Sequence, residues 1–349
     1  MDIKYTGEKT LAAIIAEVSA RFARTIPDYV ATEAERLAAV VQNRQNANTI
    51  SFIACADMHH SLALSGQTEQ MTESLKHAGQ AMGLIRKMVH VDFAAMLGDM
   101  IWDDGETPDA AMDAMRAVNT AIADGFAAIP NFRTRGNHDG LGQGTGTLTD
   151  AQVCANIAKW NTNMAHGSML HGYGFQDFEE YKLRVILLNT GETSSGYRMS
   201  AEQRTWFSAA LDLGEKLLAD GWGSIILSHI PLDLWGSDSE EMQILAAASG
   251  VICQFHGHLH NFMVGNLGST SIKRICIPNM CFYDSNVFDQ SDEYPVDDAG
   301  YVETTTYNKT AGTEQDTAFC VVTIDRETGK VYADHYGAGY DREVDVPAW

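Results

Sequence analysis

Short apolar runs that alternate with helical segments constrain the fold of this chain more than any other feature. Six runs of strand length are rich in apolar residues, and amphipathic helical spacing fills several of the intervals between them. The runs cover residues 50–57, 93–99, 130–137, 184–191, 224–229 and 251–258. Helices are predicted over residues 69–90, 109–126, 149–163 and 201–219. This alternation predicts an α/β fold with a largely parallel central assembly covered by helices.

The N-terminal segment has a different pattern. Residues 11–25 and 30–43 are predicted to form two short amphipathic helices separated by Pro27. We expect a helical appendage over residues 1–48 that packs on the body of the protein. A role in oligomerisation is the alternative, and the sequence leaves the oligomeric state open.

The rest of the chain, residues 49–349, is predicted to form one domain. Acidic residues are dense after Asp284, and residues 284–316 are predicted to form an acidic loop excursion. The apolar alternation that follows predicts a C-terminal hairpin over residues 317–339.

Composition limits the classes of partner. Acidic residues exceed basic ones by 46 − 24 = 22, so the surface repels a nucleic-acid backbone and an extended nucleic-acid partner is not expected. A small phosphorylated substrate is compatible with this charge if the site itself is locally positive. The six cysteines show no CxxC pair, and we expect reduced core residues rather than disulfides.

Neither a membrane span nor an export signal is indicated. The sequence has no apolar run of about 18 residues, so we expect no membrane association. The first residues lack the basic segment of a signal peptide, which predicts a cytoplasmic protein.

Polar side chains follow five of the six apolar runs. The carboxyl ends of strands meet at one edge of an open α/β sheet, so these side chains are expected to converge there. In the last run, His258 and His260 point to the same side of an extended segment, whereas Gly257 prevents such an assignment for His256. Carboxylate, amide and imidazole groups together suit Mn²⁺, Fe²⁺ or Zn²⁺. The residues are Asp57, His59, Asp99, Asn137, His138, His229, His258 and His260.

The ordered set of motifs resembles the calcineurin-like metallophosphoesterase family. The motifs are DMH, GD, GNHD, SHIP and GHLH, and together they span roughly residues 50–262. The resemblance implies a sandwich of two mixed β-sheets flanked by helices, with a two-metal site at the sheet edge. It also implies metal-dependent hydrolysis of a phosphoric diester or monoester.

The resemblance assigns a role to each residue of the motifs. One metal is expected on Asp57, His59 and His260, and the second on Asn137, His229 and His258. Asp99 would bridge both metals, whose identity (Mn²⁺, Fe²⁺ or Fe³⁺, or Zn²⁺) stays open. Two such ions can activate a shared hydroxide for in-line attack at phosphorus. His138 would donate a proton to the leaving alkoxide.

A non-catalytic protein is the alternative function. The ending YGAGYDRE and the N-terminal helices resemble phosphoesterase-like proteins of bacterial genomes and prophages. A metal-binding protein with a structural or assembly role would fit that resemblance.

One position departs from the family pattern. Many members have an aspartate three residues after the bridging one, where it orients the catalytic histidine, but this chain has Trp102 there. Asp103 or Asp139 could take over that role, and the sequence does not decide between them.

Four further residues near the motifs have two readings each. His60 and His256 could touch substrate, although rim or packing positions are favoured. Arg133 and Arg135 could contact phosphate or form structural salt bridges. The glycines of the motifs, Gly98, Gly136 and Gly257, are expected to let the ligands approach the metals.

Overall fold

The computed structural model describes most of the chain. It covers residues 26–62, 68–102, 107–140, 148–161, 164, 166–168, 170–192, 198–211, 220–260, 262–280 and 309–349. The helix predicted over 11–25, most of the excursion over 284–316, and Asp103 lie outside these residues.

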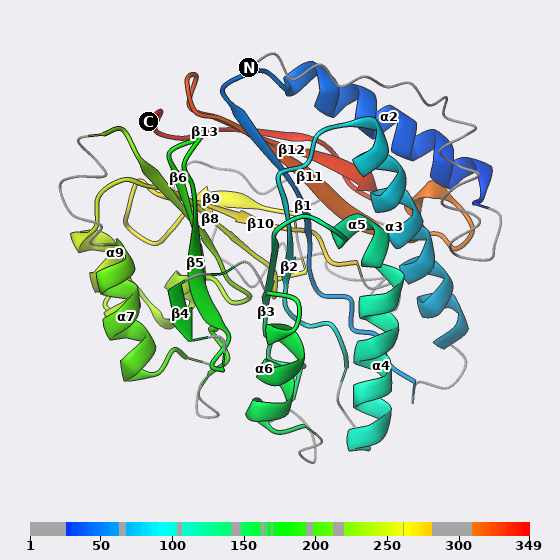
Figure 1. Ribbon diagram of the computed structural model, residues 1–349, viewed down its shortest axis with the longest axis horizontal. Coiled ribbons are helices and arrows are strands. Elements are labelled where there is room, and N and C mark those ends of the chain that lie inside the picture. Colours follow the sequence, from blue (N-terminus) through cyan, green and yellow to red (C-terminus); the bar gives the residue numbers. More distant parts are fainter. Residues whose placement is uncertain are drawn as a thin grey trace.

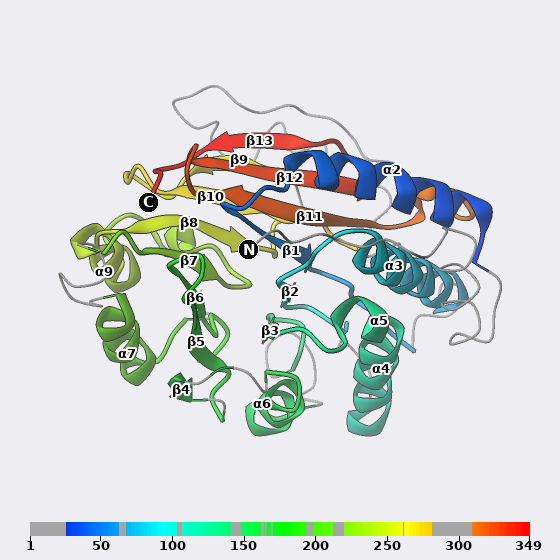
Figure 2. The same ribbon diagram turned by 45° about the horizontal axis from the view of Figure 1, so that its top comes forward.

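Two mixed β-sheets form the centre of the molecule (Figures 1 and 2). The first sheet has the order β13-β12-β11-β1-β2-β3, with β1, β2 and β3 parallel and the other three strands antiparallel to their neighbours. Its strands are β1 (Thr49–Cys55), β2 (Phe93–Leu97), β3 (Asn131–Thr134), β11 (Ala318–Asp325), β12 (Lys330–Gly337) and β13 (Arg342–Asp345). β11 and β12 are the hairpin strands, and α2 packs against both of them as part of the same core.

The second sheet has the order β4-β5-β6-β7-β8-β10-β9, and its four inner strands from β6 to β10 run parallel. Its strands are β4 (His166–Ser168), β5 (Tyr173–Phe178), β6 (Leu183–Leu187), β7 (Gly223–Leu227), β8 (Val251–His256), β9 (Val264–Asn266) and β10 (Lys273–Cys276). The predicted fold of two mixed sheets flanked by helices is confirmed. The expected parallel arrangement holds for β1 to β3 and for β6, β7, β8 and β10, whereas β11 to β13 of the first sheet and β4, β5 and β9 of the second are antiparallel to their neighbours.

Helices cover the outer face of each sheet, so the molecule has four layers (Figures 1 and 2). The first sheet is covered by α2 (Asp28–Arg44), α3 (Thr68–Met88), α4 (Pro108–Ala121), α5 (Ala123–Phe126) and α6 (Asp150–Ala158). The second sheet is covered by α7 (Ala201–Leu211) and α9 (Glu240–Ala247). Two 3₁₀ turns, η1 (Leu232–Trp235) and η2 (Glu314–Asp316), complete the described elements.

The alternation of side chains along β1 shows why this run is largely apolar, with a buried Ser51 that bonds to Thr323. Ile53 and Cys55 pack toward the helices, whereas Phe52 and Ala54 pack between the two sheets. A strand that is buried on both faces needs apolar residues at most positions, and its buried polar groups need hydrogen-bond partners. β1 is therefore a central strand, and its carboxyl end opens at the edge where the polar motifs begin.

Two predicted helices have different ends in the structure. The helix expected over 109–126 is interrupted at Ile122, which separates α4 from α5. The helix expected over 149–163 ends at Ala158, because the side chain of Asn161 bonds to the backbone N–H and carbonyl of Arg133. That tertiary contact holds the chain against β3 instead of in a further helical turn.

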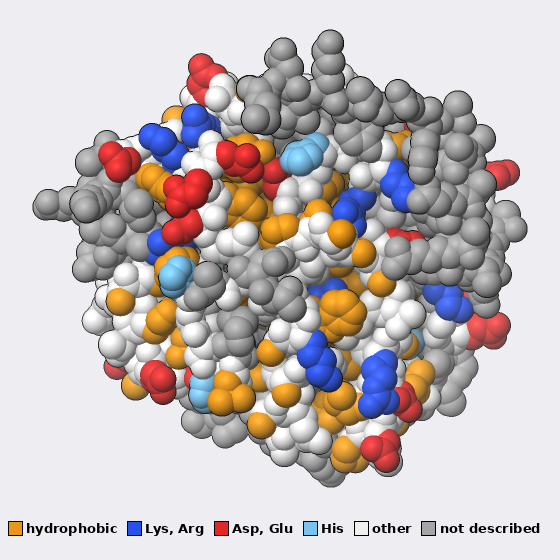
Figure 3. Space-filling model, in the orientation of Figure 1, with side chains coloured by type: hydrophobic (Ala, Val, Ile, Leu, Met, Phe, Trp, Pro, Cys, Tyr) orange, Lys and Arg blue, Asp and Glu red, His pale blue; other side chains and the backbone are white. Residues whose placement is uncertain are grey.

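The surface mixes charges of both signs. On the face drawn in Figure 3, lysine and arginine side chains are interspersed with acidic and hydrophobic ones. No helix among the described residues is long and apolar enough to cross a membrane. Five of the six cysteines lie in the described part, where all are buried and none forms a disulfide with another described residue.

Candidate dimetal centre

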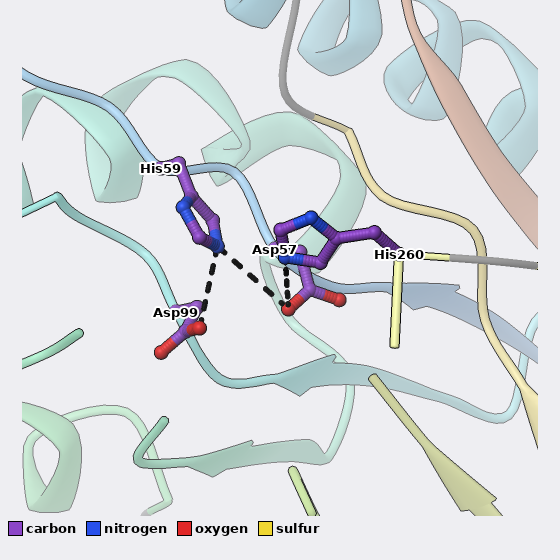
Figure 4. Close-up of side chains that lie close together, drawn as sticks. All are labelled: Asp57, His59, Asp99 and His260. Carbon is purple, nitrogen blue, oxygen red and sulfur yellow. Dashed lines mark ion pairs between the residues drawn. The ribbon is translucent and has the colours of Figure 1, made fainter. Parts of the chain in front are cut away.

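The carboxyl ends of strands from both sheets bring the predicted ligands together. Potential ligand atoms of Asp57, His59, Asp99 and His260 all lie within 4.8 Å of one another (Figure 4). A second group, within the same limit, consists of Asp99, His229 and His258. Asp99 belongs to both groups, so the geometry matches two adjacent cation sites with one shared carboxylate.

One oxygen of Asp99 lies at the junction of the two groups. Its Oδ2 atom is 3.2 Å from Nε2 of His59 and 3.1 Å from Nε2 of His229. This oxygen is buried, and no described residue donates a hydrogen bond to it. A buried carboxylate oxygen without a donor is costly unless a cation lies against it. The residues present therefore fit a metal at this position.

The side chain of Asn137 points into the second group. Its Oδ1 atom lies 3.0 Å from Nε2 of His229, and only 3% of the residue is exposed. On the other side of the His229 ring, Nδ1 lies 2.7 Å from the carbonyl oxygen of Leu97. That carbonyl can accept only from a protonated Nδ1, so Nε2 is the nitrogen that would face a metal. Burial opposes a charge on this ring, but Asp99 and Asp57 outweigh it and raise the pKa of His229 to about 9, so a metal would displace a proton from Nε2.

Backbone strain is concentrated in these residues. Among the described residues, seven other than glycine have positive φ, and five of them are Asp57 (52°), His59 (47°), Asp99 (51°), His258 (70°) and His260 (54°). Such conformations are uncommon for residues with a Cβ, and they cluster at functional sites. The strain marks the strand ends as a site, independently of the motifs.

Hydrogen bonds between the strand ends hold the strained turns in place. The backbone N–H of His258 donates to both carboxylate oxygens of Asp57, each at 3.0 Å. The N–H of His138 donates to Oδ1 of Asp99 at 2.7 Å, and the N–H of His59 donates to the Asp99 carbonyl at 3.0 Å. Each turn is therefore fixed by a ligand from another strand.

Close backbone approach explains the glycine of the GNHD motif. A Cβ atom at Gly136 would lie 2.0 Å from Oδ1 of Asp99 and 2.2 Å from its backbone nitrogen. No side chain fits that space, so Gly136 lets the turns after β2 and β3 touch.

Both carboxylates of the site stay ionised despite burial. Burial alone would raise the pKa of Asp57, but His59, His260 and His229 hold it below the usual value. In the same way, His229 and His59 outweigh burial and hold the pKa of Asp99 well below its usual value. For His258, burial and the neighbouring His229 lower the pKa to about 4. Anionic carboxylates and a neutral imidazole are the forms that bind divalent metals.

Residues 50–262 match the sequence profile of the family described as calcineurin-like phosphoesterase. The chain belongs to this family. The predicted family and the prediction of a metallophosphoesterase are thereby confirmed. No curated protein matches the sequence significantly.

A solved structure shares the fold of this phosphoesterase. A dimetal phosphatase from Danio rerio is similar over 85% of this chain and 98% of its own, with a TM-score of 0.55 and 14% identity. A protein provisionally assigned as a 5′-nucleotidase from Staphylococcus aureus is similar over 86% of this chain and 54% of its own, with a TM-score of 0.45 and 13% identity. At these identities the similarity concerns the fold.

Of the two aspartates considered as orienting partners of His138, only Asp139 lies in the described part of the chain. Oδ1 of Asp139 accepts from the backbone N–H groups of Met100 and Ile101, and Oδ2 accepts from that of Gly136. The Asp139 carboxylate thus ties the strand-end turns together and is directed to the backbone instead of to His138. Trp102 stacks on the His138 ring, a contact that sequence reasoning missed although the position was singled out.

The other candidates of the phosphoesterase are packing residues. His60 and His256 are buried, which lowers their pKa values to about 4 and about 3. Arg133 is fully buried, lies over the rings of Phe126 and Trp160, and donates to Asn119.

Both readings of Arg133 were therefore wrong, since it reaches neither the site nor, among the described residues, a carboxylate. Arg135 donates to the carbonyl oxygens of Gly191 and Gly140 and so connects two loops beside the site.

Proposed function

We propose that this phosphoesterase hydrolyses a small phosphoric ester at a dimetal centre. Asp57, His59 and His260 would hold one metal, and Asn137, His229 and His258 the other. Asp99 would contact both, and its buried Oδ2 between two imidazoles is the observation that carries the proposal. When bound, two such metals act as Lewis acids toward the phosphoryl group and lower the pKa of water at the site.

The charge of the protein residues favours an anionic substrate. Asp57 and Asp99 contribute two negative charges, whereas Asn137 is neutral. Two divalent cations would therefore leave the site positive, within a chain that carries a net charge of −22. This local reversal of sign supports a small phosphorylated substrate that binds through its phosphate.

His138 is proposed to donate a proton to the leaving oxygen. Its backbone is fixed by the 2.7 Å bond to Asp99, and its ring centroid is 4.9 Å from that of His59. The imidazole therefore lies beside the ligands without belonging to either ligand group. General acid catalysis of this kind contributes about 10²- to 10⁴-fold to turnover.

Turnover of two model esters before and after chelation tests this function. We expect the protein to hydrolyse bis-p-nitrophenyl phosphate or p-nitrophenyl phosphate, to lose activity with a chelator, and to recover it with Mn²⁺. The ratio of the two rates separates a diesterase from a monoesterase. Metal-loaded protein that hydrolyses neither these esters nor a panel of nucleotide and alkyl phosphates would contradict the proposal.

A His138→Asn variant tests the proton donor. We expect it to keep both metals and to lose about 10²-fold or more of kcat on an alkyl phosphate, whose poor leaving group needs the proton that this ring donates. The exposed His166 on β4 offers a matched control, and His166→Asn is expected to keep full turnover. Full turnover of an alkyl phosphate by metal-loaded His138→Asn would refute the assignment.

A further inference from the structure

Three aromatic rings lie against one another where β1, β2 and β3 end. The indole of Trp102 is stacked on the imidazole of His138, with ring centroids 4.3 Å apart and an angle of 14° between the planes. The same indole is 5.1 Å from the ring of His59. One side chain thus touches both a proposed metal ligand and the proposed proton donor.

The backbone of Trp102 is held by the two turns that carry the carboxylates. Its N–H donates to the carbonyl of His60 at 3.1 Å, and the N–H of His60 donates to the carbonyl of Met100 at 3.0 Å. His60 and Ile101 also form an isolated parallel bridge. The backbone that carries the indole is therefore fixed relative to the turns after β1 and β2.

Backbone contacts alone do not orient the His138 ring. The bond from its N–H to Asp99 fixes the main chain, whereas contacts of the ring itself set the two side-chain torsions. Face-to-face packing on an indole restricts both torsions, because rotation of the ring would break the stacked contact. The neighbouring carboxylate of Asp139 is engaged by backbone N–H groups.

We propose that Trp102 is a positioning residue that holds the imidazole of His138 in place for proton transfer to the leaving oxygen. The inference rests on the proposed function, because it assigns to Trp102 the orientation of that proton donor. An aromatic platform thereby stands at the position where a carboxylate was expected. The platform acts through ring geometry and carries no charge of its own.

The leaving group determines how large the effect of Trp102 is. A poor leaving group, such as an alkoxide, depends on the proton donor, whereas p-nitrophenolate leaves without much help. A misplaced donor costs on the order of 10²-fold. Trp102→Ala is therefore expected to lower kcat on an alkyl phosphate by about 10- to 100-fold, with a smaller loss on p-nitrophenyl phosphate and little change in KM.

A double-mutant cycle with metal analysis tests the proposal. The variants are Trp102→Ala, His138→Ala and the double variant, each assayed on an alkyl and a p-nitrophenyl ester. We expect Trp102→Ala to have almost no effect when His138 is already absent, and the metal content to stay unchanged. Trp102→Phe, which keeps a ring for stacking, should recover most of the loss. Trp206→Ala, which removes an indole that packs on Tyr173, controls for general destabilisation.

The outcomes separate this inference from the proposed function. If the wild-type protein turns over esters but the losses in the cycle are additive, or if Trp102→Ala loses metal, only the positioning role is overturned. Unchanged leaving-group dependence in Trp102→Ala would also overturn it. A wild-type protein that loads metal but turns over no ester would instead contradict the proposed function, and the positioning role with it.

Discussion

The proposed ligands Asp57 and Asp99 and the β12 residue Asp334 are buried carboxylates in opposite environments. At the strand ends, imidazoles surround Asp57 and Asp99 and keep their pKa values low. On β12, Asp334 is fully buried, and burial together with the charge of Asp341 raises its pKa to about 6. The first environment stabilises the ionised carboxylates, which are the forms that bind a cation, whereas the second destabilises the ionised form of Asp334. Asp139, beside the ligands, resembles Asp334, because burial and the charge of Asp99 raise its pKa to about 6.

Backbone geometry differs between the same two regions. Five residues of the strand-end turns, all of them proposed ligands, have positive φ. In the described C-terminal part, residues 309–349, only glycines have positive φ, and β11 and β12 pair over eight consecutive positions. The strained turns and the stabilised carboxylates thus lie at the same edge of the molecule. The regular strand β11 pairs with β1, whose carboxyl end carries the first of these turns.

The largest expected effect comes from removing the shared charge. Asp99→Asn keeps the shape of the side chain but weakens binding of both metals. We expect turnover to fall on the order of 10³-fold, the upper range for loss of one electrostatic contact at an active site. Elemental analysis should show fewer than two metals per chain. Near-normal turnover with two metals would contradict the role of Asp99.

A glycine substitution tests whether the close packing of the turns matters. Gly136→Ala places a Cβ on Asp99, and we expect about a 10²-fold loss of turnover, since displacement by about 1 Å has that effect. Gly191→Ala is the matched control, because its Cβ would find no neighbour nearer than 3.6 Å. Equal kinetics and equal melting temperatures for the two variants would show that the turns can separate without consequence.

A smaller effect is expected from changing the charge of the second ligand group. Asn137→Asp would add a negative charge to the site and so weaken binding of inorganic phosphate, by about tenfold for a loss of about 1.4 kcal/mol. Inhibition of ester hydrolysis by phosphate measures this directly. An unchanged inhibition constant would count against the charge argument.

A substitution of Asp334 is expected to leave turnover unchanged and to increase the stability of the folded protein. Because its pKa is raised from 3.8 to about 6 in the folded protein, its contribution to stability falls as pH rises through this interval and stays low above it. Asp334→Asn removes the penalty. We expect the free energy of unfolding to rise by up to about 3 kcal/mol at pH 8 and to change little at pH 4. Loss of the attraction between Asp334 and Arg44 makes the gain at pH 8 smaller than this upper bound.

Urea unfolding at the two pH values checks this prediction. Turnover of Asp334→Asn should equal that of wild type, since β12 carries no proposed ligand. A destabilised variant at pH 8 would show that Asp334 is ionised and paired in the folded protein, and would remove the contrast with Asp99.

The sequence predicts the central strands and the ligand cluster well, for physical reasons. A strand buried on both faces is largely apolar, as β1 and β8 are apart from hydrogen-bonded residues such as Ser51 and Gln254, so its end and the polar cluster after it are visible in the sequence. Because parallel strands align their ends, the proximity of Asp57 and Asp99 follows from the pairing of β1 with β2, whereas His258 reaches them from the second sheet.

Features that depend on long-range contacts could not be predicted. The end of α6 is set by the bonds of Asn161 to Arg133, and the short strands β4 and β9 exist only through pairing with a neighbouring strand. The stack of Trp102 on His138 joins residues 36 positions apart in sequence, from two different turns. Local periodicity contains no information about such contacts.

Anomalous diffraction from crystals of Mn²⁺-loaded protein would test the central claim most directly. We predict two manganese peaks, one among Asp57, His59 and His260 and the other among Asn137, His229 and His258, with Asp99 in contact with both. A single peak, or two peaks that do not share Asp99, would contradict this account of the site.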